Sequence, residues 1–419
     1  MPTVEGTPLT LRWDSGSKIS RFMLEVSRRI ADVEHSPIRK LVPYADEAKR
    51  RGVKVYHLNI GQPDIKTPEV ALDALRKIDL DVLAYSPSQG FMSLRKKICE
   101  YYKRYGLDYA PENVTVTTGG SEAVFFTFLT CLDPGDEIIT TEPTYANYIA
   151  FAKAAGVTIR TVPARIEDNF ALPPAGAFEA MVTPATKAIL ICNPNNPSGC
   201  IYSEKEIRTL ADIVKKHNLF LFSDEVYREF VYGNTKFFSA GHFGDVAGNV
   251  VILDSFSKRY SECGIRIGAV VTKNEQVVDG ILKLCQARLS PPLLGQIVAE
   301  ASCSAGDEYL GPIISEYTHR RNVLLEGLKK IPGVLAAEPS GAFYTIARLP
   351  VADAEEFCRW CLSDFEYEGE TVMMAPASGF YVTPGLGRSE VRLAYVLESH
   401  SLERAMFLLG KALEKYSSI

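Results

Sequence analysis

The sequence predicts an α/β fold, in which a large domain with a mostly parallel sheet covered by helices is joined to a smaller α+β domain. Short apolar segments alternate with longer helical segments from about residue 54 to residue 292, which is typical of a parallel sheet with helices on both faces. Beyond Pro292 the pattern changes to a long helical region, roughly 293–330, and then to short strands mixed with helices. With 419 residues the chain is long enough for two or three domains.

Seven segments of the first region are predicted to be strands of a covered sheet, because each is short and mostly apolar or β-branched. In chain order they are VKVYHL, NVTVTT, DEIITTE, VTIRTVP, KAILIC, LFLFSD and NVVILDS. Segments of helical period lie between them, such as SEAVFFTFLTCL, YANYIAFAKAA and SEKEIRTLADIVKKHN. In the last of these, Ser203 and Glu206 have the spacing of a capping box, which predicts that a helix starts there.

The second region supplies four more strand-like segments, GVLAAE, AFYTIAR, TVMMAP and EVRLAYV, with helices at about 353–364 and 400–415. We therefore predict three parts. Residues 1–53 form an N-terminal arm and part of the small domain, 54–292 form the large domain, and 293–419 form the small C-terminal domain. In a parallel sheet ligands bind at the carboxyl ends of the strands, so functional residues are expected in the loops that follow the strands.

The overall composition argues against several classes of function. The net charge of −5 is mild, whereas nucleic-acid and membrane-surface proteins usually present a basic face. The first twenty residues lack the apolar run of a signal peptide, and no later stretch has the roughly 20 consecutive apolar residues that would span a bilayer. The nine cysteines, an odd number without regular spacing, favour reduced thiols. We therefore expect a cytoplasmic protein.

One cysteine pair has a spacing that needs an explanation, because Cys358 and Cys361 form a C-x-x-C motif. The pair fits a redox dithiol or half of a zinc site, but it also fits two cysteines on one face of a helix that starts near Asp353. No second C-x-x-C motif and no histidine cluster completes a zinc tetrad. The helical interpretation is therefore favoured, and no metal site is predicted.

Two loops that follow predicted strands are suited to binding polar groups. Residues 118–123 (TGGSEA) precede an apolar helix, and free N–H groups at a helix N-terminus suit a phosphate. A strand-to-helix turn that needs glycine for steric reasons would have the same sequence. Residues 193–199 (NPNNPSG) predict a rigid turn whose Asn amides can donate hydrogen bonds, although these are also ordinary loop residues.

Charged residues follow two further strands. Asp224 ends the strand LFLFSD, where a carboxylate is costly to bury without a cationic partner, unless it only caps a helix. Lys258 follows the strand NVVILDS, and Arg266 lies eight positions further on. This lysine is either a solvated surface charge or the amine that holds a cofactor, beside a Ser/Arg group that binds a phosphate.

Taken together and in order, these motifs resemble the pyridoxal 5′-phosphate (PLP)-dependent aminotransferases of fold type I, in the class I/II group that contains aspartate aminotransferase. The resemblance extends over nearly the whole chain, from the motif at 58–64 (LNIGQPD) to that at 391–394 (VRLA). It implies the fold type I architecture, PLP as the cofactor and a homodimer.

The resemblance also implies roles for residues around the cofactor ring. Lys258 is similar to the lysine that binds PLP as a Schiff base, and Asp224 to the acid that pairs with the pyridine nitrogen. Tyr227 and Asn196 match the residues that hydrogen-bond the phenolic oxygen of the ring. Tyr145 falls where an aromatic side chain stacks on the ring. Of these, Lys258, Asp224 and Tyr227 are the predicted catalytic residues.

Further matches concern the phosphate group and the substrate. The residues that match the phosphate-binding cup are Gly120, Ser121, Ser255 and Arg266, with Ser257 as a further candidate. Arg392 resembles the arginine that grips the α-carboxylate of the substrate, and Gly61 and Asn196 are also expected to contact the substrate. Tyr85 matches a tyrosine that reaches the phosphate of the neighbouring subunit's cofactor, which implies shared active sites.

Each of these roles fits the chemistry of its side chain. A buried carboxylate such as Asp224 keeps a pyridine nitrogen protonated, and the resulting cation withdraws electrons from the Cα atom of the substrate. Once the substrate has displaced it, Lys258 is a free amine that can carry a proton. Arginine forms bidentate pairs with carboxylates, so Arg392 can fix the orientation of an amino acid as lysine could not.

The sequence departs from the common family pattern at two positions. Ile265 stands where a tryptophan often precedes the phosphate-binding arginine, and Cys263 stands where a small hydroxyl residue is frequent. Because Lys258 and Arg266 are intact, we expect these changes to alter packing around the site rather than cofactor binding.

We expect an aminotransferase with ping-pong kinetics that moves an amino group from an L-amino acid to a 2-oxo acid such as 2-oxoglutarate. The resemblance favours aspartate as donor, with alanine and aromatic amino acids as alternatives. Two other functions are a PLP-dependent carbon–sulfur β-lyase and a non-catalytic PLP-binding protein. An acidic substrate needs a cation for its distal carboxylate, and the candidates are Arg288, Arg39 and Lys40, unless these are solvated surface charges.

Overall fold

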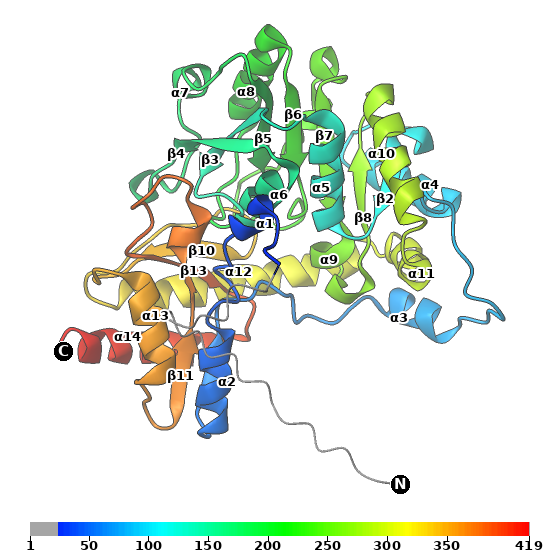
Figure 1. The fold of residues 1–419 in the computed structure, drawn as a ribbon. Helices are drawn as coiled ribbons and strands as arrows, with labels where there is room; N and C mark the ends of the chain where they lie inside the picture. Colours follow the sequence, from blue (N-terminus) through cyan, green and yellow to red (C-terminus); the bar gives the residue numbers. More distant parts are fainter. Residues whose placement is uncertain (1–23, 419) are drawn as a thin grey trace.

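The computed structural model describes residues 24–418, and its largest sheet has seven strands in the order β2-β8-β7-β6-β5-β3-β4 (Figure 1). Strand β8 runs antiparallel to both of its neighbours, and the other neighbouring pairs are parallel. The strands are β2 Val114–Thr117, β3 Glu137–Glu142, β4 Thr158–Pro163, β5 Thr186–Cys192, β6 Phe220–Asp224, β7 Val250–Ser255 and β8 Gly268–Val271. The predicted mostly parallel sheet is thus confirmed.

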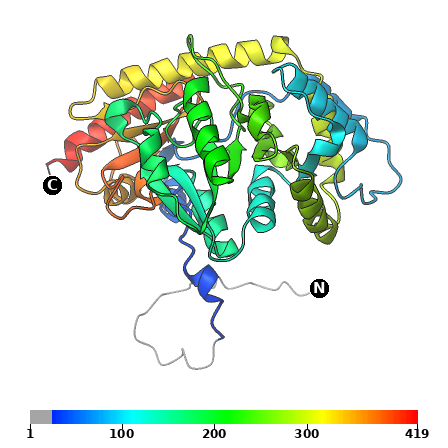
Figure 2. The same ribbon diagram turned by 90° about the horizontal axis from the view of Figure 1, so that it is seen from above.

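The described residues form α-helices of very different length, of which α12 is a single long rod along one side of the molecule (Figure 2). Their bounds are α1 Arg28–Ala31, α2 Val42–Arg50, α3 Glu69–Arg76, α4 Met92–Lys103, α5 Gly120–Cys131, α6 Ala146–Ala155, α7 Ala175–Glu179, α8 Glu204–His217, α9 Phe256–Arg259, α10 Glu275–Arg288, α11 Leu293–Ser302, α12 Asp307–Lys329, α13 Ala354–Ser363 and α14 Ser399–Tyr416. Within residues 24–418, none of the helices combines the length and apolar composition needed to cross a membrane.

Helices cover both faces of the large sheet (Figures 1 and 2). On one face Phe128 of α5 and Ile281 of α10 share a core with Leu190 of β5. On the other face Ile207 of α8 belongs to a second core with Ile189, the neighbour of Leu190 in the same strand. Successive residues of β5 thus point to opposite helical layers, as the two-residue repeat of a strand requires. Burial on both faces explains why these strands are apolar throughout.

The remaining strands form two small sheets beside the large one (Figure 1). An antiparallel sheet has the order β12-β13-β10-β9, and a parallel pair joins β1 to β11. The strands are β1 Lys54–His57, β9 Leu335–Ala336, β10 Tyr344–Arg348, β11 Glu370–Met373, β12 Ala375–Pro376 and β13 Glu390–Ala394. Helix α13 packs on α2 and β11, and α14 packs on α12 and β11. This part is the predicted smaller α+β unit.

Two segments near the predicted domain boundaries make contacts that the sequence did not indicate. Lys54–His57, expected to open the large domain, pairs instead with β11 in a two-stranded sheet. Helix α11, expected in the C-terminal domain, packs on α3 and α4. Local composition indicates that a strand or helix forms but does not say which distant partner it meets. We therefore propose that the large domain starts after β1 and includes α11. The part of the predicted arm at 1–23 lies outside the described residues.

Local signals placed several other elements correctly. Ser203 caps α8, where its Oγ accepts a hydrogen bond from the Glu206 N–H at 3.3 Å and the Glu206 carboxylate accepts one from the Ser203 N–H at 2.7 Å. Asp353 caps α13, and Cys358 and Cys361 are buried on that helix, which confirms the helical interpretation of the C-x-x-C spacing. Strand β8, with only four residues of sequence GAVV, was not predicted.

Candidate active site

The residues singled out from the sequence come together at the carboxyl ends of the large sheet. Asp224 is the last residue of β6, and Lys258 lies on α9, the short helix that directly follows β7. Gly120 opens α5 after β2, and Asn196 lies in the loop after β5. The small unit contributes Arg392 from β13, whose side chain contacts Asn196. The candidate site is therefore built where the two parts of the chain meet.

Lys258 is held by a short capped helix. The Ser255 Oγ accepts a hydrogen bond from the Ser257 N–H at 3.2 Å and so caps α9. The half-buried Lys258 Nζ donates to the Gly61 carbonyl oxygen at 2.7 Å, and the Cys263 Sγ lies 4.0 Å from it. Lys258 has no carboxylate partner among residues 24–418. Its amine is therefore not committed to an ion pair.

Asp224 is a buried carboxylate without a cation beside it among the described residues. The Tyr148 hydroxyl donates to its Oδ2, and the Val226 N–H donates to its Oδ1 at 3.3 Å. Burial raises the pKa of Asp224 to about 6, although these two hydrogen bonds act in the opposite direction. A cation placed beside this carboxylate would be stabilised by it, because the charge is not yet neutralised.

Arg392 is a buried cation that also lacks a carboxylate partner in residues 24–418. Its Nη1 donates to the Asn196 Oδ1 at 3.1 Å, its Nη2 donates to the Asn59 carbonyl oxygen at 2.5 Å, and its Nε has no partner. The guanidinium carbon lies 4.4 Å from the centre of the Tyr344 ring. Burial lowers the pKa of Arg392. A buried charge without a counter-ion is unfavourable, so the position suits the carboxylate of a ligand.

Two tyrosines and one glycine shape the space between these groups. The hydroxyls of Tyr227 and Tyr344 lie 3.0 Å apart. A side chain at Gly61 would overlap the Tyr344 ring and hydroxyl, so a residue larger than glycine would displace Tyr344. Tyr145, half-buried, lies with its ring centre 5.2 Å from that of Tyr148, the residue that bonds Asp224. The predicted Tyr227, Gly61 and Tyr145 are therefore close to the predicted charged groups or their direct partners.

A group of small and hydroxyl residues surrounds the start of α5. Gly119 caps the helix with a φ of 79°, a conformation that favours glycine, and the Arg266 guanidinium lies where a side chain on Gly119 would point. A Cβ atom on Gly120 would lie 3.4 Å from the Ser255 Cβ, and the Ser255 and Ser257 hydroxyls lie 3.0 Å apart. Ser121 is in the first turn of α5. Free helix N–H groups, hydroxyls and a guanidinium together suit a phosphate.

Four predicted residues are exposed or already paired with other side chains. Tyr85 is 78% exposed, whereas Tyr227 and Arg392 of the site are buried. Arg288 pairs with Glu122 at 2.8 Å. Lys40 pairs with Glu355, and Arg39 is exposed. The cations proposed for a distal carboxylate are therefore paired or exposed.

Tyr148 and Tyr344 belong to the site but were missed from the sequence. Tyr148 lies three positions after Tyr145 on the same helix face, a spacing that could have indicated it. Tyr344 lies inside an apolar strand, where its hydroxyl needs a polar partner, but the sequence does not reveal that the partner is Tyr227.

Comparison with known proteins decides the family. The family described as aminotransferase class I and II matches residues 53–406 of the chain. The chain belongs to the class I and II aminotransferases. An aspartate aminotransferase from Pyrococcus horikoshii is 30% identical over 93% of this chain and 97% of that protein.

Solved structures agree with this aminotransferase family. A double mutant of Thermus thermophilus aspartate aminotransferase superposes with a TM-score of 0.85 at 29% identity, covering 93% of this chain and 100% of that chain. An alanine aminotransferase from Pyrococcus furiosus has a TM-score of 0.84 at 30% identity with the same coverage. The resemblance read from the sequence and the expected fold type are confirmed. The protein is an aminotransferase, whose substrates are amino acids and 2-oxo acids.

The two departures from the family pattern lie beside the lysine and the arginine of this aminotransferase. The Cys263 thiol donates to the Ser257 carbonyl oxygen at 3.2 Å, and the Cys263 carbonyl oxygen accepts from Arg266 Nη1 at 2.9 Å. Ile265 is half-buried and packs with the second core of the large sheet. Both residues thus contribute to packing and to the shape of the turn between Lys258 and Arg266.

Proposed function

We propose that this aminotransferase binds PLP, the cofactor of its family, and transfers the amino group of L-aspartate to a 2-oxo acid such as 2-oxoglutarate in a ping-pong reaction. One observation carries the proposal. A single site combines an amine, a buried carboxylate and a buried guanidinium, in Lys258, Asp224 and Arg392, and none of the three has an ion-pair partner among residues 24–418. A cofactor with a cationic ring and a substrate with a carboxylate would supply the missing charges.

The residues present fit PLP at each of its polar groups. The start of α5 with Ser255, Ser257 and Arg266 would hold the phosphate. Asp224 would hold the protonated pyridine nitrogen, which would lower the pKa that burial has raised. In chain order, the other residues proposed to contact the cofactor are Gly120, Ser121, Tyr145, Asn196 and Tyr227. These assignments give Asp224 a cationic partner and leave Arg392 free for the substrate.

When bound, PLP supplies an electron sink for the bonds at the substrate Cα. Arg392 would bind the α-carboxylate and so orient the amino acid, with Asn196 holding the guanidinium in place. Lys258 Nζ, which is not in an ion pair, would remove the proton from the Cα atom of the amino donor. In the second half-reaction it would deliver a proton to the Cα atom of the amino acid that forms from the 2-oxo acid. Asp224 would keep the pyridine nitrogen of the cofactor protonated, and therefore positively charged, throughout the reaction. Tyr227 and Tyr344 would limit the space beside Gly61.

Aspartate is supported by the name of the Pyrococcus horikoshii relative and by the Thermus thermophilus structure. Alanine is a second candidate, because Arg288 and Lys40 already have carboxylate partners and a Pyrococcus furiosus alanine aminotransferase is equally similar in structure. An aspartate-specific enzyme would then take its distal cation from a second subunit.

A homodimer with shared active sites is part of the proposal. Tyr85 lies in an exposed apolar stretch that also includes Leu80, Val82 and Leu83. Apolar side chains gathered on a surface in this way favour a protein partner. In such a dimer Tyr85 would reach the neighbouring cofactor rather than its own.

The proposal is tested by a panel of amino donors with 2-oxoglutarate and pyruvate as acceptors. Aspartate with 2-oxoglutarate should give the highest kcat/KM. A higher kcat/KM for alanine would show that aspartate is not the preferred donor, but the reaction would still be an amino transfer. Release of pyruvate and ammonia from a cysteine-type substrate, without need for an acceptor, would contradict the aminotransferase assignment in favour of a β-lyase.

A further inference from the structure

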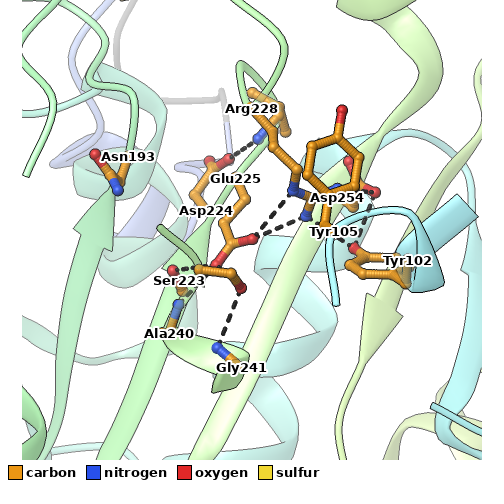
Figure 3. Close-up of polar contacts among 12 residues, drawn as sticks. Tyr102, Tyr105, Asn193, Ser223, Asp224, Glu225, Arg228, Ala240, Gly241 and Asp254 are labelled. Atoms are coloured by element: carbon orange, nitrogen blue, oxygen red, sulfur yellow. Dashed lines mark hydrogen bonds and ion pairs between the residues drawn. The ribbon is translucent and has the colours of Figure 1, made fainter. Parts of the chain in front are cut away.

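A second set of charged residues lies buried directly behind the candidate site. We call it the buried Arg–Tyr cluster, and its members are Tyr101, Tyr102, Glu225, Arg228, Glu229, Asp254 and Arg259. Figure 3 shows Arg228 between Glu225 and Asp254, with Tyr102 beside it. All of the charged side chains in this cluster are at most 2% exposed. No step proposed for the amino transfer uses them.

Arg228 is the centre of one half of the cluster. Its Nη2 pairs with the Glu225 Oε2 at 2.8 Å, and its Nη1 lies 3.6 Å from the Asp254 Oδ2. The same guanidinium donates to the Tyr101 hydroxyl at 3.0 Å and to the Tyr102 hydroxyl at 3.1 Å. Tyr102 in turn donates to Asp254 at 3.0 Å. Both tyrosines come from α4, so this helix is joined to the ends of β6 and β7.

Arg259 is the centre of the other half. Its Nη2 pairs with the Asp254 Oδ2 at 2.8 Å, and its Nη1 donates to the Tyr101 hydroxyl at 2.9 Å and lies 3.5 Å from the Glu229 Oε1. Tyr101 donates to Glu229. A single tyrosine hydroxyl and a single carboxylate thus connect the two arginines, and the halves form one continuous network.

Four residues of the cluster directly precede or follow a proposed site residue in the chain. Glu225 follows Asp224, and Arg228 follows Tyr227. In the same way, Asp254 precedes Ser255 and Arg259 follows Lys258. A change in the bonding of Arg259 therefore acts on the backbone that carries Lys258.

The charges of the cluster also reach the site. Burial would raise the pKa of Asp254, but Arg259 and Arg228 hold it below its usual range. The cluster contains two guanidiniums and three carboxylates, so it carries one carboxylate in excess. Asp254 and Glu225 contribute to the raised pKa of Asp224, after the larger effect of burial. The two arginines offset negative charge that would otherwise act on Asp224 more strongly.

We propose that the buried Arg–Tyr cluster positions the residues of the site. Arg259 and Arg228 hold the turn that carries Lys258 against the end of β6, and their positive charges offset the negative charge near Asp224. This inference rests on the proposed PLP site. It assigns no chemical step to the cluster. Its residues act through the lysine and aspartate that touch the cofactor, and they are positioning residues.

The test is a pH titration of the visible absorption band of the cofactor in the holoenzyme, compared for the wild type and three variants. Arg259→Met removes a positive charge and loosens the Lys258 turn, so the titration midpoint should rise by about one pH unit. Arg259→Lys keeps the charge but loses the fork that joins Tyr101 to Asp254, so a smaller shift is expected. Tyr102→Phe keeps every charge and removes two hydrogen bonds. It should shift the midpoint least and release PLP faster than wild type.

Tyr202→Phe is the matched control, because Tyr202 is equally buried but lies outside the buried Arg–Tyr cluster, and its hydroxyl lies 3.1 Å from that of Thr141. It should titrate and hold PLP as the wild type does. If the cluster only stabilised the fold, the substitutions would lower the midpoint of thermal unfolding and leave the pH titration of the cofactor band unchanged. Unchanged titration in Arg259→Lys and Tyr102→Phe would therefore overturn the positioning role even if Arg259→Met did not fold. A wild type without a cofactor band would instead overturn the PLP proposal itself.

Discussion

Two neighbouring groups of buried charges differ in how they are balanced. In the buried Arg–Tyr cluster Arg228 and Arg259 each contact carboxylates and tyrosine hydroxyls. In the candidate site Arg392 and Asp224 are just as buried, but neither has an ion-pair partner in residues 24–418. Folding alone rarely retains an uncompensated buried charge, so the site is best explained by a ligand that completes it. Paired charges belong to the scaffold, and the unpaired charges lie where we propose that the cofactor and substrate bind.

The largest effect is expected for the lysine of the site. Lys258→Ala removes the amine that would hold PLP and carry the Cα proton, so kcat should fall by about 1,000-fold or more. Steady-state transamination measures it. Lys283→Ala, at an exposed lysine paired with Asp279 on α10, is the control and should keep full activity. Near wild-type activity of Lys258→Ala would remove this residue from the mechanism.

The next effect compares how much a buried arginine of the Arg–Tyr cluster and a buried arginine of the candidate site contribute to the free energy of unfolding. Arg259→Met leaves Asp254 and Glu229 buried with fewer partners, so the free energy of unfolding should fall by about 3–5 kcal/mol. Arg392→Met, at an equally buried arginine without a carboxylate partner, should lower it much less in the protein without ligands. Urea unfolding of both variants measures the difference. Equal losses would show that the distinction between balanced and unbalanced charges has no energetic basis.

Asp224 gives a pH-dependent contrast. Its pKa is about 6 in the folded chain and about 4 when unfolded, so folding favours the protonated form. That contribution is complete below about pH 4 and is lost as pH rises through about 6. Without PLP, Asp224→Asn should therefore gain stability relative to wild type by about 3 kcal/mol between pH 4 and 7. Unfolding curves of both proteins at several pH values measure this gain. A stability difference that stays constant between pH 4 and 7 would contradict the raised pKa of Asp224.

The smallest effect concerns the substrate. Arg392→Met should raise KM for the amino donor by about 100-fold, because it removes a charge-assisted pair with the α-carboxylate. The absorption band of the bound cofactor should persist. Loss of the band together with activity would show that Arg392 holds the cofactor rather than the substrate.

Much of this architecture could be predicted from the sequence. The seven strands expected from apolar, β-branched segments all form, and Ser203 starts α8 as the capping box indicates. These signals are local. The pairing of β1 with β11 and the short strand β8 could not be predicted, because both depend on partners far away in the sequence.

The same distinction applies to the residues of the candidate site. Asp224 and Lys258 could be singled out from the sequence because each ends or follows an apolar strand, where ligands bind, and the family resemblance suggested their roles. Tyr344 was missed because its partner Tyr227 comes from another part of the chain. Arg228 and Arg259 are ordinary loop charges in the sequence, and only the fold brings them to one carboxylate, Asp254.

The central claim is that PLP binds among the unpaired charges of the site and is attached to Lys258. Borohydride reduction of the purified holoenzyme, followed by peptide mapping, tests it most directly. The account predicts loss of the visible band and one pyridoxyl group per chain, attached to Lys258. A protein without such a band, or a label on any other lysine, would contradict the account.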